Sequence, residues 1–410
     1  MKQYINLITI LLFSFAGADR INFFGNPNAP FILTPFLIIG VFLILSLLVI
    51  GFRSIDFSWF TSDKFFTLSF FSYLLCVFLS IIFSLDPFMS SKRTILLLFI
   101  ITVFIFLISY YDYRELLDLI VKGSVLGSFL FLIFNIILLL NWLGMIEANI
   151  KIIDFEPDTI AYFLPRLGGF CSDANRSGFI LTVFTFFLIH NRHSNKMINY
   201  VVILNVFMII LSLSRTTYIL FILTSIVYIL FLSKKGEMKY FLMIFFIPII
   251  LLVYFLSTYD FKNLFDLESA LSERLGDFSL TRFTSAGIHL RLIIEGFQLA
   301  LSELKILFFG IGQGVSHLVI KGYYWSGSKY GNFHSQYITI LVENGFLALI
   351  AFLNISFLIP IIKYRKNLVF PLLFSLFFYN IFYQLSYEPL YWFLILFFYK
   401  VNQNMNPEFK

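Results

Sequence analysis

Long apolar stretches recur along almost the whole chain, and they constrain its fold more than any other feature. A helix needs about 20 apolar residues to cross the hydrocarbon core of a membrane, and we interpret about twelve stretches as such helices. They are 4–17, 31–51, 65–85, 94–110, 116–140, 178–190, 197–213, 216–233, 239–257, 336–360, 368–385 and 388–400. Charged residues make up 13% of the 410 residues, whereas a soluble domain has about 25%. The sequence therefore predicts an all-α, polytopic bundle of about 12 transmembrane helices.

The first apolar stretch also resembles a secretory signal peptide, because Lys2 precedes it. Gly17-Ala18-Asp19 is a poor cleavage site, however, and a long polytopic chain follows. We therefore interpret residues 4–17 as an uncleaved first membrane helix.

Positively charged loops indicate the orientation, because short basic loops tend to remain in the cytoplasm. The loops 190–196, 233–239 and 363–366 are basic and alternate correctly through the predicted helices. They place both termini inside and the segments 142–177 and 258–335 outside. Lys92 and Arg93 fall on the outer side and conflict with the rule. The net charge of +6 is mostly this topology signal, so we expect no nucleic-acid partner.

The sequence gives no sign of a cofactor or of a second domain. The two cysteines, Cys76 and Cys171, are too few for a disulfide framework. The sequence contains no metal-binding motif, no phosphate-binding glycine loop and no nucleotide fingerprint. We predict a single integral membrane domain over residues 1–410, with two sizeable outer loops and no cofactor.

The two outer loops are the expected place for chemistry. The segment 258–335 is polar and nearly 80 residues long, and 142–177 changes from acidic to basic and glycine-rich. A purely structural bundle does not need such loops, and long loops are often functional lids or binding segments.

Three motifs follow one another in these regions. The first is Arg166-Leu167-Gly168-Gly169-Phe170 with Asp173-Ala174-Asn175, and the second is Leu213-Ser214-Arg215-Thr216-Thr217. The third comprises Arg291, Gly310-Ile311-Gly312-Gln313-Gly314, His334-Ser335-Gln336-Tyr337 and Glu343-Asn344-Gly345. In this order and on one side of the membrane, they resemble the bacterial O-antigen polymerase and O-antigen ligase superfamily over about 160–350. Ser335 and Asp173 depart from the common family pattern.

The resemblance implies a metal-independent glycosyltransferase in the bacterial inner membrane. Its donor would be a glycan on undecaprenyl diphosphate, used at the periplasmic face. The resemblance also implies the lipid bilayer, a chain-length regulator and a flippase as partners.

The same resemblance assigns roles to individual residues. Arg166, Arg215 and Arg291 would bind the diphosphate, because arginine stays charged and can contact two phosphate oxygens at once. Their charge would stabilise the leaving group. His334 would act as the general base for the acceptor hydroxyl, with a pKa near neutrality if unperturbed. Arg176 and Glu343 are further candidates for substrate binding, and no metal ligands are expected.

Each candidate also has a structural alternative. Arg215 could anchor a helix end in the headgroup layer, and Arg166 could pair with Asp158 or Asp173. Arg291 could pair with Glu295, one helical turn later. The run 310–314 is more typical of a turn than of a phosphate cradle.

Three functions are open at this point. We favour a polymerase that joins lipid-linked repeat units into an O-antigen or capsule chain over the sister ligase, which moves a finished glycan onto lipid A–core. The third is a lipid-linked oligosaccharide flippase or other transporter, which would be expected to have short loops. A metal-dependent membrane glycosyltransferase would need an acid just after the first helix, and Asp19 is the candidate there.

Overall fold

The structure is a computed structural model that describes residues 1–24, 33–51, 55–148, 150–160, 164–191, 196–232, 285–320, 332–363 and 367–405. Within these ranges the chain is predominantly helical, which confirms the all-α part of the predicted fold class. The two strands among them, β1 (Asp158–Ile160) and β2 (Leu164–Arg166), form an antiparallel hairpin. The predicted helix 239–257, the loop 233–239 and, within 258–335, residues 258–284 and 321–331 lie outside the described residues.

The predicted membrane segments in the described ranges coincide with helices. Four helical runs are long and apolar enough to cross a membrane: α4 (Lys64–Ile82), α5 (Pro87–Tyr110), α6 (Tyr113–Trp142) and the run Phe346–Lys363. Shorter apolar helices include α2 (Pro35–Ile50), α8 (Met197–Leu211), α9 (Arg215–Phe231) and α17 (Phe370–Phe382). The total of about twelve crossings stays a prediction.

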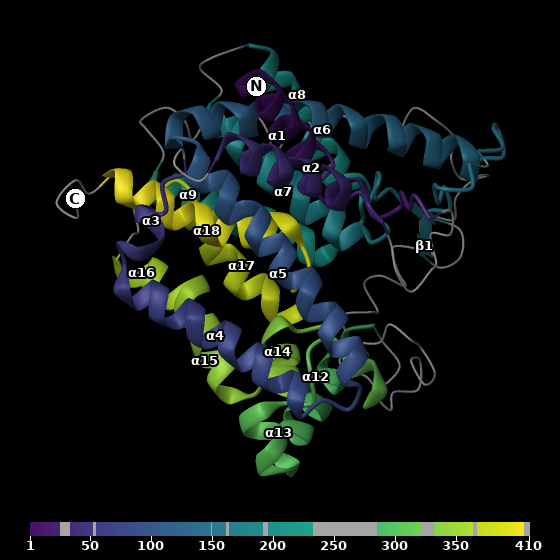
Figure 1. Cartoon of the computed structure of the whole chain (residues 1–410). Helices are drawn as coiled ribbons and strands as arrows, with labels where there is room; N and C mark the ends of the chain where they lie inside the picture. Colours follow the sequence, from purple (N-terminus) through teal and green to yellow (C-terminus); the bar gives the residue numbers. More distant parts are fainter. Residues whose placement is uncertain are drawn as a thin grey trace. The chain divides into compact units, whose positions relative to one another are not determined.

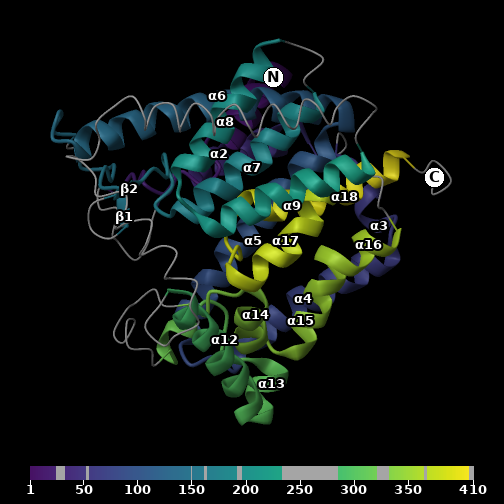
Figure 2. The same cartoon turned by 180° about the vertical axis from the view of Figure 1, so that it is seen from behind.

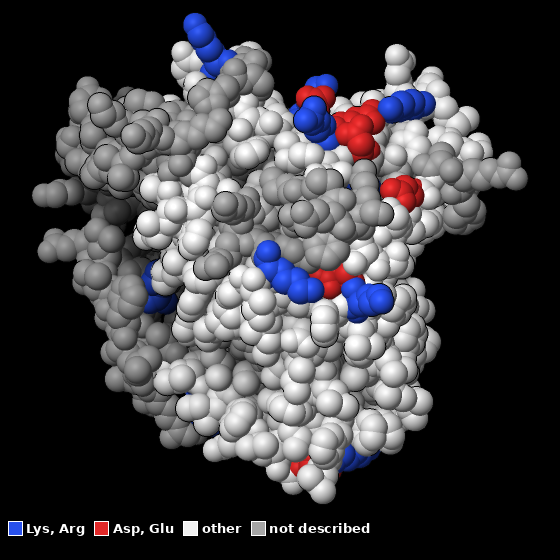
Figure 3. Space-filling model, turned by 90° about the vertical axis from the view of Figure 1, so that its left-hand side faces the viewer, with Lys and Arg blue, Asp and Glu red and all other residues white. Residues whose placement is uncertain are grey.

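Helix α4 shows how the apolar surface is divided between core and exterior. Its buried face carries Phe66, Phe70, Tyr73 and Val77. The opposite face is also apolar, and its exposed side chains recur at helical spacing: Phe65, Leu68, Phe71, Leu75, Phe78 and Ile82. Among the described residues in Figure 3, charged side chains appear in a few groups, and large areas between them carry no charge. Soluble monomers rarely expose apolar patches of this extent, so lipid is the solvent that suits them.

The described chain forms two compact units. Unit 1 comprises Met1–Asp56 and Ile105–Leu271, and unit 2 comprises Phe57–Phe104 and Ser272–Lys410.

In unit 1, α1 (Lys2–Ser14) packs on α2 and α6, and α7 (Ala174–His190) packs on α6, α8 and α9 (Figures 1 and 2). Gly123 of α6 allows the close approach of α1, because a Cβ atom there would lie 2.7 Å from the Cβ of Phe13. The hydroxyl of Ser14 donates to the carbonyl of the same glycine at 3.1 Å. Unit 1 thus surrounds α7, which is buried along most of its length.

Unit 2 contains α3 (Ser58–Thr61), α4, α12 (Ser285–Ser302), α13 (Leu304–Phe309), η4 (Ser316–Leu318), α14 (Gln336–Asn344), α15 (Phe346–Leu353), η5 (Asn354–Leu358), α16 (Ile359–Lys363), α17 and α18 (Pro389–Met405). Helix α14 contacts α12, α13, α15 and α17, and α15 runs beside α4 (Figure 1). Helices α12 and α13 show that the described part of 258–335 is structured, although its polarity predicted a loop.

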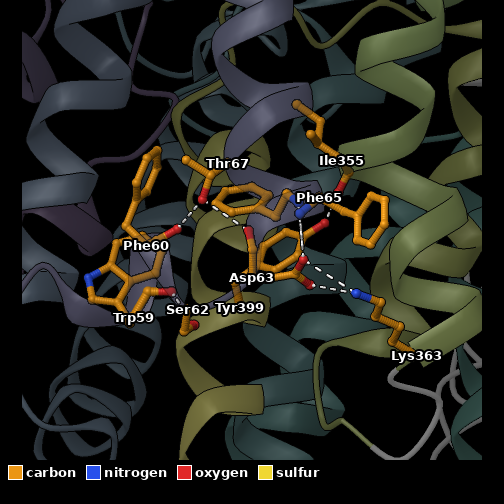
Figure 4. A network of polar contacts seen from close by, with 10 residues as sticks. Trp59, Phe60, Ser62, Asp63, Phe65, Thr67, Ile355, Lys363 and Tyr399 are labelled. Carbon is orange, nitrogen blue, oxygen red and sulfur yellow. Dashed lines mark hydrogen bonds and ion pairs between the residues drawn. The ribbon is translucent and has the colours of Figure 1, made fainter. Parts of the chain in front are cut away.

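Polar contacts fix one end of unit 2 (Figure 4). Asp63 caps α4 by accepting hydrogen bonds from the backbone N–H groups of Phe65 and Phe66 at 3.0 and 3.2 Å. The ammonium of Lys363, at the end of α16, lies 3.4 Å from the same carboxylate. The start of α4 and the end of α16 therefore lie together, in agreement with the predicted alternation of loops. Which end is cytoplasmic stays a prediction.

The predicted single helix 336–360 is interrupted at Gly345. This residue has φ +87 and separates α14 from α15. A Cβ atom at Gly345 would lie 2.3 Å from the carbonyl oxygen of Phe308. The glycine therefore permits both the bend and the close approach of α13.

Candidate functional site

The N-termini of α7 and α9 meet at Asn175. Its Oδ1 accepts hydrogen bonds from the hydroxyls of Ser214 at 2.5 Å and Thr216 at 3.3 Å. Its backbone carbonyl accepts one from the hydroxyl of Thr217 at 3.3 Å. Gly178 lets the helices approach, because a Cβ atom there would lie 2.1 Å from Cγ2 of Thr217. The motifs around 175 and 215 are therefore joined in one place.

Both helix starts are capped by side chains. Asp173 accepts from the backbone N–H groups of Asn175 at 2.6 Å and Arg176 at 3.4 Å. Ser214 accepts from the N–H of Thr217 at 3.2 Å. A helix N-terminus carries roughly half a positive charge, which favours anions. Two such termini side by side reinforce that potential.

Predicted arginines lie at this junction. The guanidinium of Arg166, at the end of β2, donates to Oδ1 of Asn175 at 3.2 Å and to the carbonyl of Ser212 at 3.3 Å. Arg215 is the first residue of α9, directly after the cap Ser214. One asparagine thus connects the positions of two arginines that are 49 residues apart in sequence.

Arg176 is held by Asp19, the acid named above for a metal-dependent alternative. The guanidinium lies 2.6 Å from the carboxylate. Asp19 also accepts hydrogen bonds from the backbone N–H of Ser172 at 2.7 Å and from its hydroxyl at 2.5 Å. The adjacent Arg20, only 2% exposed, donates to the carbonyls of Cys171 and Glu156. The segment 142–177 is therefore anchored to residues 19–20.

Two non-glycine residues of the described chain have a positive φ: Leu213 and His334, both at +51. Leu213 directly precedes Ser214, the N-cap of α9, and His334 directly precedes Ser335, the N-cap of α14. Such conformations persist only when the surroundings enforce them, and they are concentrated at functional sites.

His334 lies in unit 2, just before α14. Its backbone N–H donates to the side-chain oxygen of Asn332 at 2.7 Å. Its imidazole stacks on that of His289, with ring centroids 4.1 Å apart and planes 13° apart. Burial lowers the pKa of His334 from 6.5 to about 4. The ring is therefore neutral near pH 7 and retains the lone pair that a general base needs, although the lowered pKa also makes it a weaker base.

Glu343 organises the glycine-rich turn 310–314. Its carboxylate, which is 2% exposed, accepts hydrogen bonds from the backbone N–H of Gly314 at 2.8 Å and of Ser316 at 3.3 Å. The hydroxyl of Ser316 donates to the same carboxylate. The N–H of Gly312 donates to the backbone carbonyl of Glu343 at 3.0 Å. The run is a turn fastened to the end of α14, as its composition predicted.

Arg93 lies beside this turn. Its guanidinium carbon lies 5.5 Å from the ring centroid of Tyr387, whose hydroxyl accepts from Gln313 at 2.8 Å. Arg93 is also close enough to interact electrostatically with Glu343. One of the two cations that conflict with the predicted topology therefore lies near a buried carboxyl group.

Arg291 forms the ion pair that was considered as its structural alternative. Its Nε lies 2.5 Å from a carboxylate oxygen of Glu295, one turn further along α12. A salt bridge of this kind is half-exposed and adds little stability.

The predicted residues thus fall into two groups. Arg166, Arg176 and Arg215 belong to unit 1, and Arg291, His334 and Glu343 belong to unit 2. No role was predicted for Asn175, His289 or Arg93. Asn175 and His289 contact predicted residues, and Arg93 interacts electrostatically with Glu343. No group of three His, Cys, Asp or Glu side chains in the described ranges is arranged to hold a metal ion. Metal independence stays a prediction.

A family model described as O-antigen ligase matches residues 200–353. The match contains Arg215, Arg291, His334 and Glu343, whereas Arg166 and Arg176 precede it. No curated protein matches the chain. The match confirms the resemblance to the superfamily that the motifs predicted.

Proposed function

We propose that this multi-pass membrane protein, which resembles the O-antigen polymerase and ligase superfamily over residues 200–353, is a polysaccharide polymerase. It would be a glycosyltransferase that joins repeat units carried on undecaprenyl diphosphate into an O-antigen or capsular chain. The reaction takes place at the periplasmic face of the bacterial inner membrane. A chain-length regulator and a flippase are the partners expected of such an enzyme.

The junction at Asn175 is the observation that carries this proposal. It combines two helix N-termini with the arginines at 166 and 215, and Arg176 lies in the first turn of α7. A diphosphate is a compact dianion or trianion, and bidentate arginine contacts and helix N-termini are two of the commonest ways to bind one. We assign Arg166, Arg176 and Arg215 to the donor diphosphate, with Arg291 as a further ligand.

His334 is assigned to the acceptor. The acceptor hydroxyl oxygen attacks the anomeric carbon of the donor glycan, and its proton passes to the imidazole. The bond between the anomeric carbon and the phosphate oxygen breaks, and undecaprenyl diphosphate leaves with the bonding electrons. Positive groups stabilise the charge that develops on this leaving group. We assign Glu343 an indirect role in substrate binding, through the turn 310–314 that its carboxylate holds.

The topology is part of the proposal. Both termini are placed in the cytoplasm, and 142–177 and 258–335 in the periplasm. Reporter fusions after Lys235 and Lys366 should behave as cytoplasmic, and a fusion after Lys321 as periplasmic. A cytoplasmic signal at Lys321 would reject the assignment of the chemistry to the periplasmic face.

Deletion of the gene, followed by a gel of the surface glycans, tests the function. A polymerase mutant should retain lipid A–core that bears at most one repeat unit. Single units trapped on the cytoplasmic side would indicate a flippase instead.

The ligase is the second candidate, favoured by the description of the matching family model as O-antigen ligase. A ligase would transfer the finished glycan to lipid A–core by the same displacement at the anomeric carbon. The deletion mutant would then accumulate long glycan on undecaprenyl diphosphate, which a polymerase mutant cannot do.

A further inference from the structure

His289 is the residue that lies against the ring of His334, and it belongs to none of the motifs that carry the family resemblance. It is the fifth residue of α12, and α12 packs on α14 within unit 2. The two imidazole planes are nearly parallel, at 13°. Nothing in the assigned reaction uses His289, so its position needs its own explanation.

The packing of α12 directs His289 toward His334. Gly296 is the point of closest approach, because a Cβ atom there would lie 2.3 Å from Ile338 and 2.8 Å from Phe333. His289 precedes Gly296 by seven residues, or about two helical turns, and therefore lies on the same face of α12. Leu292, between them, is buried in the same core cluster as Phe333. His289 thus lies at the polar end of the buried face of α12, and the packing of the residues that follow it holds it in place.

We propose that His289 is a positioning residue, which holds the imidazole of His334 in its working orientation by stacking face to face on it. This inference rests on the proposed role of His334 as the general base. His334 has a backbone conformation that L-residues rarely adopt, and its backbone is tied to Asn332. The backbone contacts fix where the side chain begins, and the stack fixes the plane of the ring. A base must be held within a few tenths of an ångström of its productive position, so the plane matters to the rate.

The physical chemistry of the pair agrees with this role. Flat aromatic rings at this separation attract one another beyond the area that they bury. The stack is favourable when at least one ring is neutral, because two imidazolium ions 4.1 Å apart would repel. The lowered pKa of His334 keeps that ring neutral at working pH.

Chemical rescue separates positioning from packing. His334→Gly removes the ring and suits the positive φ, since glycine adopts that conformation without strain. Turnover of lipid-linked repeat units is measured with the purified protein while imidazole is added. We expect imidazole to restore part of the rate when His289 is present. In His289→Ala/His334→Gly, the half-saturating imidazole concentration should rise about threefold to tenfold, because the stacking platform is lost.

A second series of variants tests the proposal even if imidazole does not enter the space left by the ring of His334. Single variants His289→Phe, His289→Leu and His289→Ala are compared, after size-exclusion profiles in detergent show that each is folded. Phenylalanine keeps a flat ring, so kcat should stay within about threefold of the parent, whereas Leu and Ala should lower kcat about tenfold at unchanged KM.

Three outcomes decide the proposal. Equal rescue with and without His289 would overturn it, and so would equal kcat for the Phe, Leu and Ala variants. A loss of activity in His289→Phe as large as in His289→Ala would show that His289 acts through its own nitrogen atoms, which also contradicts positioning by stacking. Full activity in His334→Gly alone would instead contradict the role of His334 as the general base. This outcome distinguishes a failure of the proposed function from a failure of the proposed role of His289.

Discussion

The hydroxyl of Ser214 donates a hydrogen bond to the side-chain oxygen of Asn175 at 2.5 Å, and this contact joins the N-terminus of α9 to that of α7. The same oxygen accepts from Arg166. A single amide therefore sets the relative position of two helix starts and one arginine, all within unit 1.

Asn175→Ala should weaken donor binding more than it slows the chemical step. The substitution removes the acceptor shared by Ser214, Thr216 and Arg166, and a hydrogen bond to a charged group contributes about 1.5–3 kcal/mol. We expect KM for the lipid-linked donor to rise about tenfold or more, measured in detergent or liposomes. Asn175→Asp keeps the acceptor oxygens but adds a negative charge, so it should also weaken binding of the anionic donor. Parent-like KM in Asn175→Ala would show that the junction does not bind the donor.

Arg215→Ala should abolish long-chain surface glycan while the protein remains in the membrane. Loss of one preorganised group that stabilises developing charge typically costs about 10²–10³ in rate. Arg215→Lys should also be impaired, because a point charge cannot reproduce a planar, two-pronged contact. Glycan gels and immunoblots of membrane fractions measure both. Normal chain length in Arg215→Ala would mean that this arginine only anchors a helix end.

The apolar runs were sufficient to predict most helices, because membrane helices depend on local hydrophobicity. Other features depend on distant partners that the sequence does not reveal. Arg93, for example, lies near Glu343, which is 250 residues later in the chain. The break at Gly345 was missed because apolar residues continue on its far side.

Helix α12 illustrates a signal that was present but overlooked. Its residues His289, Leu292, Gly296 and Ala300 recur at spacings of three or four, which is typical of one helical face. The polarity of the surrounding segment favoured a loop, so the pattern was not used. The role of Asn175 could not be predicted, because its partners come from separate motifs and meet only in the folded chain.

The lowered pKa of His334 leads to a prediction about pH. The ring is neutral above about pH 4, so kcat should change little between about pH 8 and 5.5. An imidazole of ordinary pKa would be about nine-tenths protonated at pH 5.5 and would lose most of its activity there. A pH–rate profile of the purified protein measures this. A fall in kcat centred near pH 6.5 would contradict the buried environment of His334.

The same shift affects stability in a defined direction. The unfolded chain binds a proton at His334 near pH 6.5, whereas the folded chain does so only near pH 4. The unfolded state therefore gains protons first as the pH falls. The contribution of His334 to stability is present above about pH 6.5 and is lost between there and pH 4.

Glu343→Ala should destabilise the turn 310–314. It leaves the backbone N–H groups of the partly buried Gly314 and the buried Ser316 without their acceptor, and a fully buried orphan donor costs about 1–3 kcal/mol. We expect a lower thermal unfolding midpoint in detergent, together with reduced glycan length. Glu295→Ala removes a half-exposed carboxylate of unit 2 and is the control, with little change in the midpoint expected. Equal midpoints for both variants would show that Glu343 does not hold the turn.

The most direct test of the account is elongation by the purified protein with undecaprenyl-diphosphate-linked repeat units as the only substrate. We predict that longer lipid-linked chains form, that a chelator leaves the rate unchanged, and that His334→Ala lowers turnover by at least about a hundredfold. Failure to elongate until lipid A–core is supplied would contradict the polymerase assignment. Inhibition by the chelator, or near-normal turnover in His334→Ala, would contradict the metal-independent mechanism with His334 as its base.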